Sequence, residues 1–125
     1  MTFPELKVDK VLWYSDYWDG PLSGMLTVAG ENYWFKCYDE DVHTRARKHY
    51  IYRLTDQQLA FEFEWHKRFE KYVGTRWNMV DGRRGIGEVK PQAEHSKFYE
   101  PYKKVKHLSA DNVVKEDQIL GWCYL

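Results

Sequence analysis

The chain has 125 residues, a formal net charge of +0 at pH 7 and a mean hydropathy of -0.75. This length is typical of one domain, so we expect a single domain over residues 1–125. No apolar run approaches the roughly 20 residues that cross a bilayer, and the balanced charge lacks the excess of Lys and Arg that duplex-binding proteins carry. The composition therefore predicts a soluble, cytoplasmic protein that binds neither membranes nor duplex nucleic acid.

Short aromatic and β-branched runs follow one another in the first forty residues. The segment 10–18, KVLWYSDYW, is apolar on both alternating sets of side chains, which is typical of a strand covered on both faces. Turn signals at 19–21 (DGP) and 30–32 (GEN) separate it from two further runs, at 25–29 and 33–38. These segments predict an antiparallel meander.

A fourth strand is predicted at 48–54, and a helix follows it directly. Thr55 and Gln58 have the spacing of a capping box, in which each side chain satisfies a backbone N–H at the start of a helix. The helix extends over about residues 56–73, where Gly74 ends it. Its apolar side chains span about half of the helix circumference, so we expect it to pack on the sheet.

The segment 75–108 has no clean period and contains three glycines, two prolines and eight Lys or Arg residues. This composition predicts a long basic loop. The apolar end of the chain, ILGWCYL at 119–125, predicts a strand that is inserted between others. The expected fold class is therefore α+β: an antiparallel, strongly twisted or barrel-like sheet of five to six strands, with one long packed helix at about residues 56–73.

The basic loop holds the first candidate site. The stretch DGRRGIG places glycines around Arg83 and Arg84, and Arg76 and Trp77 come shortly before it. Glycines let backbone N–H groups converge on an anion, and paired guanidinium groups bind phosphate or carboxylate. Trp77 adds a stacking surface for a nucleotide-like ligand. The alternative is a charged loop without a ligand, because the stretch lacks the Lys-Ser/Thr of a P-loop.

A second candidate is the row formed by Glu62, His66 and Glu70, which are spaced four residues apart on the predicted helix. Carboxylate and imidazole groups can bind a metal or act as acid and base, and a neighbouring carboxylate would raise the pKa of His66. The spacing is not that of a known zinc motif, and such charge pairs are ordinary on helices. Structural pairing is the alternative, and we predict no metal and no cofactor.

Aromatic residues make up 18% of the chain, with six Trp and ten Tyr. These side chains bury large areas and often serve as bulky core. The alternative is a groove of exposed rings that stacks a base, a sugar or the side chains of a partner. The sequence leaves both interpretations open.

The leading functional prediction is a small binding module without catalysis, whose ligand is anionic and nucleotide-like and contacts Arg76, Trp77, Arg83 and Arg84. One alternative is a protein–protein interaction module of the inhibitor or immunity type, which uses exposed aromatic residues. Another is a small enzyme that uses the Glu/His/Glu row. An exposed aromatic surface or an unpaired terminal strand would also suit a homodimer.

Overall fold

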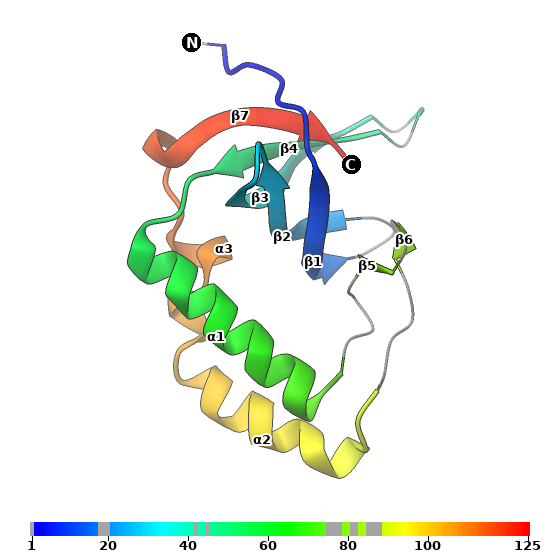
Figure 1. Ribbon diagram of the computed structural model, residues 1–125, viewed down its shortest axis with the longest axis vertical. Coiled ribbons are helices and arrows are strands. Elements are labelled where there is room, and N and C mark those ends of the chain that lie inside the picture. Colours follow the sequence, from blue (N-terminus) through cyan, green and yellow to red (C-terminus); the bar gives the residue numbers. More distant parts are fainter. Residues whose placement is uncertain are drawn as a thin grey trace. The chain divides into compact units, whose positions relative to one another are not determined.

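The computed structural model describes residues 2–17, 21–41, 43–44, 46–74, 79–80, 83–84 and 89–125, with the backbone alone at 16–17, 79–80 and 83–84. The chain divides into two compact units (Figure 1). The sheet unit comprises residues 1–53 and 114–125, and the helical unit comprises residues 54–113. The assignment of residues 1–125 to one domain stays a prediction, and each unit is described by itself.

The sheet unit is a five-stranded antiparallel sheet in the order β1-β2-β3-β4-β7. The fold class α+β and the predicted meander are confirmed. Because β1 and β7 stand at the two ends of the order, the described strands do not close into a barrel. The strands are β1 (Lys10–Tyr17), β2 (Pro21–Val28), β3 (Glu31–Glu40), β4 (Arg47–Tyr52) and β7 (Ile119–Tyr124).

The last strand, β7, lies between β4 and the beginning of the chain. On its outer side, the Leu6 N–H donates to the Trp122 carbonyl at 2.8 Å, and the Trp122 N–H donates to the Pro4 carbonyl at 3.0 Å. On its inner side, β7 pairs with β4 in antiparallel register. The predicted strand at the end of the chain is confirmed, but its predicted insertion between other strands was wrong: β7 is the last strand of the sheet, and among its described residues Trp122 alone bridges to the beginning of the chain.

Large side chains alternate between the two faces of the sheet. Trp13, Met25 and Trp34 stand opposite one another across β1, β2 and β3, and all three are buried. Gly24 and Phe35 face each other on the opposite side of the same strands. A Cβ atom at position 24 would collide with the Trp13 carbonyl oxygen and come within 2.9 Å of the Phe35 ring. Position 24 therefore has to be glycine for this ring to lie flat on the sheet.

In the chain, the helical unit comes after β4 and before β7. Two hydrogen bonds join Arg53, which follows β4, to Gln118, which precedes β7. The Arg53 N–H donates to the Gln118 carbonyl at 2.8 Å, and the Gln118 side-chain amide donates to the Arg53 carbonyl at 2.9 Å. The unit contains α1 (Asp56–Tyr72), β5 (Met79–Val80), β6 (Arg83–Arg84), α2 (Gln92–Lys103) and α3 (Ala110–Val113), with a 3₁₀ turn at Lys106–Leu108.

The first helix, α1, begins with the predicted capping box. The Thr55 hydroxyl accepts from the Gln58 N–H at 3.1 Å, and the Gln58 side chain accepts from the Thr55 N–H at 3.0 Å. Gly74 follows the helix with a φ of 133°, and its N–H donates to the Phe69 carbonyl at 3.0 Å. No helix of the described residues is long and apolar enough to cross a membrane.

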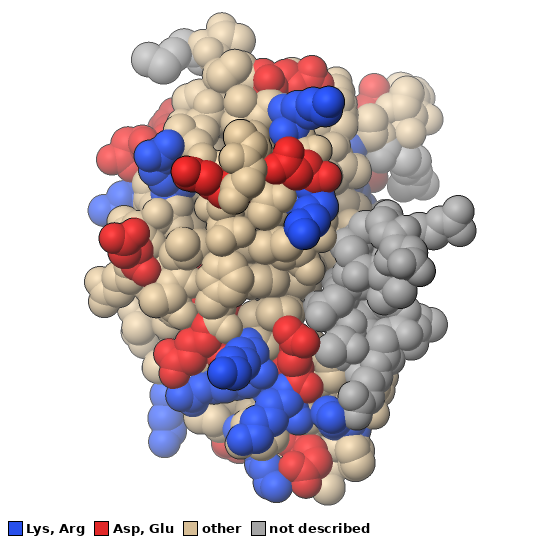
Figure 2. Space-filling view, viewed as in Figure 1, with Lys and Arg blue, Asp and Glu red and all other residues tan. Residues whose placement is uncertain are grey.

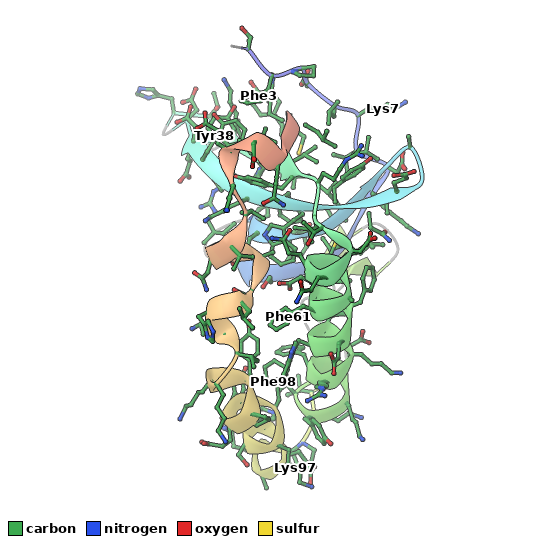
Figure 3. The ribbon with its side chains drawn as sticks, turned by 90° about the vertical axis from the view of Figure 1, so that its left-hand side faces the viewer. Phe3, Lys7, Tyr38, Phe61, Lys97 and Phe98 are labelled. Atoms are coloured by element: carbon green, nitrogen blue, oxygen red, sulfur yellow. The ribbon has the colours of Figure 1, made fainter. Side chains whose placement is uncertain are left out.

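The long loop predicted at 75–108 was wrong for residues 92–103, which form α2. This helix packs its rings against α1: the centroids of Trp65 and Tyr102 lie 5.4 Å apart, as do those of Phe69 and Phe98 (Figure 3). Pro101 concealed the helix in the sequence, because proline breaks helix interiors. In the structure Pro101 lies in the last turn of α2, so its missing N–H removes a hydrogen bond only near the end of the helix, which stops at Lys103.

The turn between β2 and β3 offers a test of the backbone conformation. Val28 and Glu31 pair across it, and the two residues between them, Ala29 and Gly30, have φ angles of 51° and 78°. Both angles are left-handed, which is typical of a type I′ turn and favours Asn-Gly over Ala-Gly. We expect Ala29→Asn to raise the free energy of unfolding by roughly 0.5–1 kcal/mol, measured by urea titration of tryptophan fluorescence.

A matched control at the same position is Ala29→Val. A β-branched side chain tolerates positive φ poorly, so this variant should be less stable than the wild type. An Ala29→Asn protein that is no more stable than the wild type would contradict the turn assignment.

Candidate functional site

An aromatic face lies on one side of the sheet unit, over β3, β4 and β7. The register of β4 and β7 places Tyr50 opposite Trp122, and Lys48 opposite Tyr124. Alternation along the strands directs these four side chains to the same side of the sheet. Together with Lys48, the aromatic face is formed by Phe3, Tyr38, Tyr50, Trp122 and Tyr124.

The rings of the aromatic face support one another. Tyr38 stacks on Tyr50 with centroids 3.8 Å apart and planes 10° apart, and Phe3 meets Tyr50 edge-on at 5.7 Å. Trp122 and Tyr124 meet edge-on at 5.1 Å. Figure 3 shows Phe3 and Tyr38 at the same end of the sheet. The side chains of Tyr38 and Tyr124 are 42% and 50% exposed, so the outer rings of a preformed cluster lie in solvent.

The cation Lys48 lies over two rings of this face. The Lys48 Nζ is 5.3 Å from the centroid of the Trp122 ring and 5.9 Å from that of Tyr124. Asp39 stands opposite Lys48 in the register of β3 and β4, yet no ion pair joins the two side chains. Lys48 thus engages the negative faces of two rings and forms no ion pair with a described carboxylate.

The opposite side of the same three strands holds Cys37, His49 and Cys123 in register. Both cysteines are free thiols. Burial lowers the pKa of His49, whose Nε2 lies 2.7 Å from the Pro21 carbonyl oxygen, so the neutral ring donates this hydrogen bond. Burial raises the pKa of Cys123 to about 12, which leaves its thiol protonated and unreactive. These three side chains therefore serve as packing on the side of the strands opposite to the aromatic face.

The Glu62, His66 and Glu70 row lies on α1 as predicted; His66 pairs with Glu70, whereas Glu62 bonds to a backbone group elsewhere in the helical unit. The Glu62 carboxylate accepts from the Ala110 N–H at 2.6 Å, and Glu62 is 8% exposed. His66 Nε2 lies 2.9 Å from a Glu70 carboxylate oxygen. Among the described residues, no group of three or more His, Cys, Asp or Glu side chains is arranged to hold a metal ion. The geometry thus favours the structural interpretation of the row.

Burial shifts the pKa values of Glu62 and His66, the two more buried side chains of the row, in opposite directions. It raises the pKa of Glu62 to about 7, helped by the charge of Asp111 and opposed by the Ala110 N–H. It lowers the pKa of His66 to about 4, so the expectation of a raised value was wrong. Glu70 fails to compensate because its carboxylate is 40% exposed and solvated. The neutral His66 ring donates from Nε2 to Glu70.

The bond from Glu62 belongs to a wider polar network of the helical unit. The side chains of Ser109 and Tyr102 share a hydrogen bond, and burial is the main cause of the raised pKa of Tyr102, which lies on α2. The Asn112 side chain donates to the Ser109 hydroxyl at 3.1 Å and to the Lys106 carbonyl at 3.0 Å. The sequence contains no local signal for this network, because Glu62 and Ala110 are 48 positions apart.

The predicted anion site falls largely outside the described residues. Arg76 and Trp77 are not described, and Arg83 and Arg84 are described as backbone alone. That backbone forms β6, which pairs in antiparallel register with β5. The two arginines are therefore consecutive residues of a short strand, and their role in binding stays a prediction.

Charges of both signs are interspersed on the molecular face in Figure 2, without a broad area of one sign. Comparison with protein-family models, with curated proteins and with solved structures finds no match to this chain. The function is therefore argued from the geometry of the chain itself.

The opposite pKa shifts of Glu62 and His66 predict a hidden pH dependence. The pKa of Glu62 is 4.5 in the unfolded chain and about 7 in the folded protein. Its contribution to the free energy of unfolding therefore falls as the pH rises from 4.5 to about 7. The pKa of His66 is 6.5 in the unfolded chain and about 4 in the folded protein. Its contribution to the free energy of unfolding therefore rises as the pH rises from about 4 to 6.5. Each effect amounts to about 3 kcal/mol over its full window, so the two largely cancel in the wild type.

Single variants should separate the two effects in urea titrations between pH 4 and 8. Relative to the wild type, Glu62→Gln should gain stability as the pH rises, because it removes a buried charge but keeps an acceptor for the Ala110 N–H. His66→Gln should gain stability as the pH falls. Differences of the same sign for the two variants would contradict the assigned shifts.

Proposed function

We propose that this chain is a protein-interaction module without catalysis, which binds a partner protein through the aromatic face. The observation that supports the proposal is the exposure of Tyr38 and Tyr124 on a cluster of rings that support one another. Tyrosine and tryptophan dominate the energetic centres of protein interfaces, because they combine large apolar area with a hydrogen-bond donor. The pKa of Tyr38 is raised mainly by burial, so its hydroxyl stays a donor at pH 7.

The rigidity of the face favours binding. Rings that are already packed against one another lose little conformational freedom when a partner covers them. The charge of the sheet unit argues for a protein partner over a nucleic acid, because residues 1–53 and 114–125 contain eight Lys or Arg and ten Asp or Glu residues.

The test compares three forms of the full chain as bait in its source cells, with cross-linking. We expect a partner to be captured by the wild type and by Tyr99→Ser, but not by the double variant Tyr38→Ser, Tyr124→Ser. Tyr99 is the matched control, because it is as exposed as Tyr38, at 42%, but lies on α2. The captured partner should bind again when purified, with a Kd at least tenfold weaker for the double variant. Capture that is independent of the two tyrosines would contradict the proposal.

A second proposal keeps the anionic ligand predicted at the basic, glycine-rich stretch after α1. Its support is the sequence, which places Arg76 and Trp77 just before this stretch and Arg83 and Arg84 within it. The backbone of both Arg83 and Arg84 lies in β6, which pairs with β5. Guanidinium groups and the backbone N–H groups of glycine-rich segments are suited to phosphate.

A thermal-shift screen of nucleotides checks the second proposal. We expect a rise in Tm for the wild type with at least one nucleoside phosphate, because a ligand that binds only the folded state stabilises it. The double variant Arg83→Ala, Arg84→Ala should lose this rise and keep the Tm of the unliganded protein. An unchanged rise in the variant, or no rise with any nucleotide, would exclude the site.

A further inference from the structure

We propose that the aromatic face binds a short extended segment of its partner, and that Lys48 pairs with a carboxylate of that segment. The inference rests on the proposed function of this face and adds the chemistry of the partner. Three features carry it: the small size of the exposed apolar area, the occupation of the sheet edge at Trp122 and the position of the Lys48 ammonium.

The exposed area is too small for a large interface. A fully covered aromatic side chain buries about 150–250 Å², so the 42% and 50% exposed side chains of Tyr38 and Tyr124 offer roughly 200 Å² together. The half-buried rings of Phe3, Tyr50 and Trp122 add less. A standard interface between folded proteins needs about 800 Å² on each partner. The area matches a few residues of an extended chain better than a folded domain or a second copy of this protein.

The edge of the sheet next to this face is occupied at Trp122 by the beginning of the chain. The Trp122 N–H and carbonyl bond to Pro4 and Leu6, so a partner strand cannot pair with the backbone of Trp122 there. A segment that covers Trp122 must instead lie on the face and place its own side chains between the rings of β3, β4 and β7. Its apolar side chains would pack against Tyr38 and Tyr124, the two exposed rings.

Lys48 determines the charge that the segment should carry. Its ammonium lies over the Trp122 and Tyr124 rings and forms no ion pair with Asp39, which stands opposite in the register. A carboxylate that reaches this ammonium would form a charge-assisted hydrogen bond beside apolar rings, where water is partly excluded. Asp39 has the opposite effect, because it repels an incoming carboxylate. Lys48 and Asp39 therefore make opposite contributions to the same contact.

The experiment is a selection of random twelve-residue peptides, displayed on phage, against the immobilised full chain. We expect the wild type to enrich sequences with Asp or Glu beside an aromatic or aliphatic residue, and the double variant Tyr38→Ser, Tyr124→Ser to enrich none. Selection against Lys48→Glu should replace the acidic residue with Lys or Arg. Such a reversal cannot result from a merely structural role of Lys48.

Affinities of the best synthetic peptide provide the quantitative test. We expect Lys48→Gln to weaken binding about tenfold and Lys48→Arg to retain it, whereas Asp39→Asn should strengthen binding two- to threefold. Thermal unfolding and circular dichroism would establish that each variant is folded. If Lys48→Glu does not fold, Lys48→Arg replaces it in the test. This variant keeps the positive charge, so loss of its preference for peptides with Asp or Glu would overturn the inference.

The remaining outcomes are distinguishable. Peptides that depend on Tyr38 and Tyr124 but show no preference for acidic residues would overturn this inference and leave the proposed function standing. No enrichment, or enrichment independent of both tyrosines, would overturn the two together. A wild-type dimer in sedimentation that depends on these tyrosines and resists peptide would assign the face to a second copy. Binding of single-stranded oligothymidine that needs Lys48 would assign it to nucleic acid.

Discussion

The register of β4 with β7 is the constraint on which the rest of the sheet unit depends. Because side chains alternate along a strand, a shift of one residue would turn Tyr50 and Trp122 into the interior and bring His49 and Cys123 to the surface. The observed register separates rings on one side from small or neutral groups on the other. The same pairing brings together segments far apart in the sequence, since the whole helical unit lies between these two strands in the chain.

Local patterns in the sequence were sufficient where the structure is local. The meander of β1, β2 and β3 and the capping box at Thr55 follow from turn residues and spacing over a few positions. The second long helix, α2, was missed because the segment has no clean period and contains Pro101, whereas its rings at Phe98 and Tyr102 pack on α1. The helical conformation of that segment depends on packing against residues far away in the sequence, and a pattern over ten residues contains no information about such contacts.

The candidate sites show the same division. The high aromatic content left bulky core and exposed rings open as alternatives, and both occur on the same sheet: Trp34 is buried, whereas Tyr38, four positions later on β3, is 42% exposed. Composition could not distinguish them, because both lie on one side of one strand and differ only in what covers them. For Glu62 the residue type was informative, but its partner, the Ala110 N–H, is a backbone group that no side-chain motif can indicate. The lowered pKa of His66 likewise reflects burial, which outweighs the neighbouring charge.

The hydrogen bonds between Arg53 and Gln118 join the end of β4 to the start of β7. Tyr52 and Ile119 stand opposite each other in an antiparallel ladder, so β4 and β7 have the geometry of an ordinary hairpin whose connection is the entire helical unit. A tight turn of a few residues would satisfy the same strand ends. In modular terms, residues 54–113 are an insertion in a five-stranded sheet whose connectivity is complete without them. All five strands that build the sheet thus belong to one unit, and the helical unit enters their order only as the connection between β4 and β7.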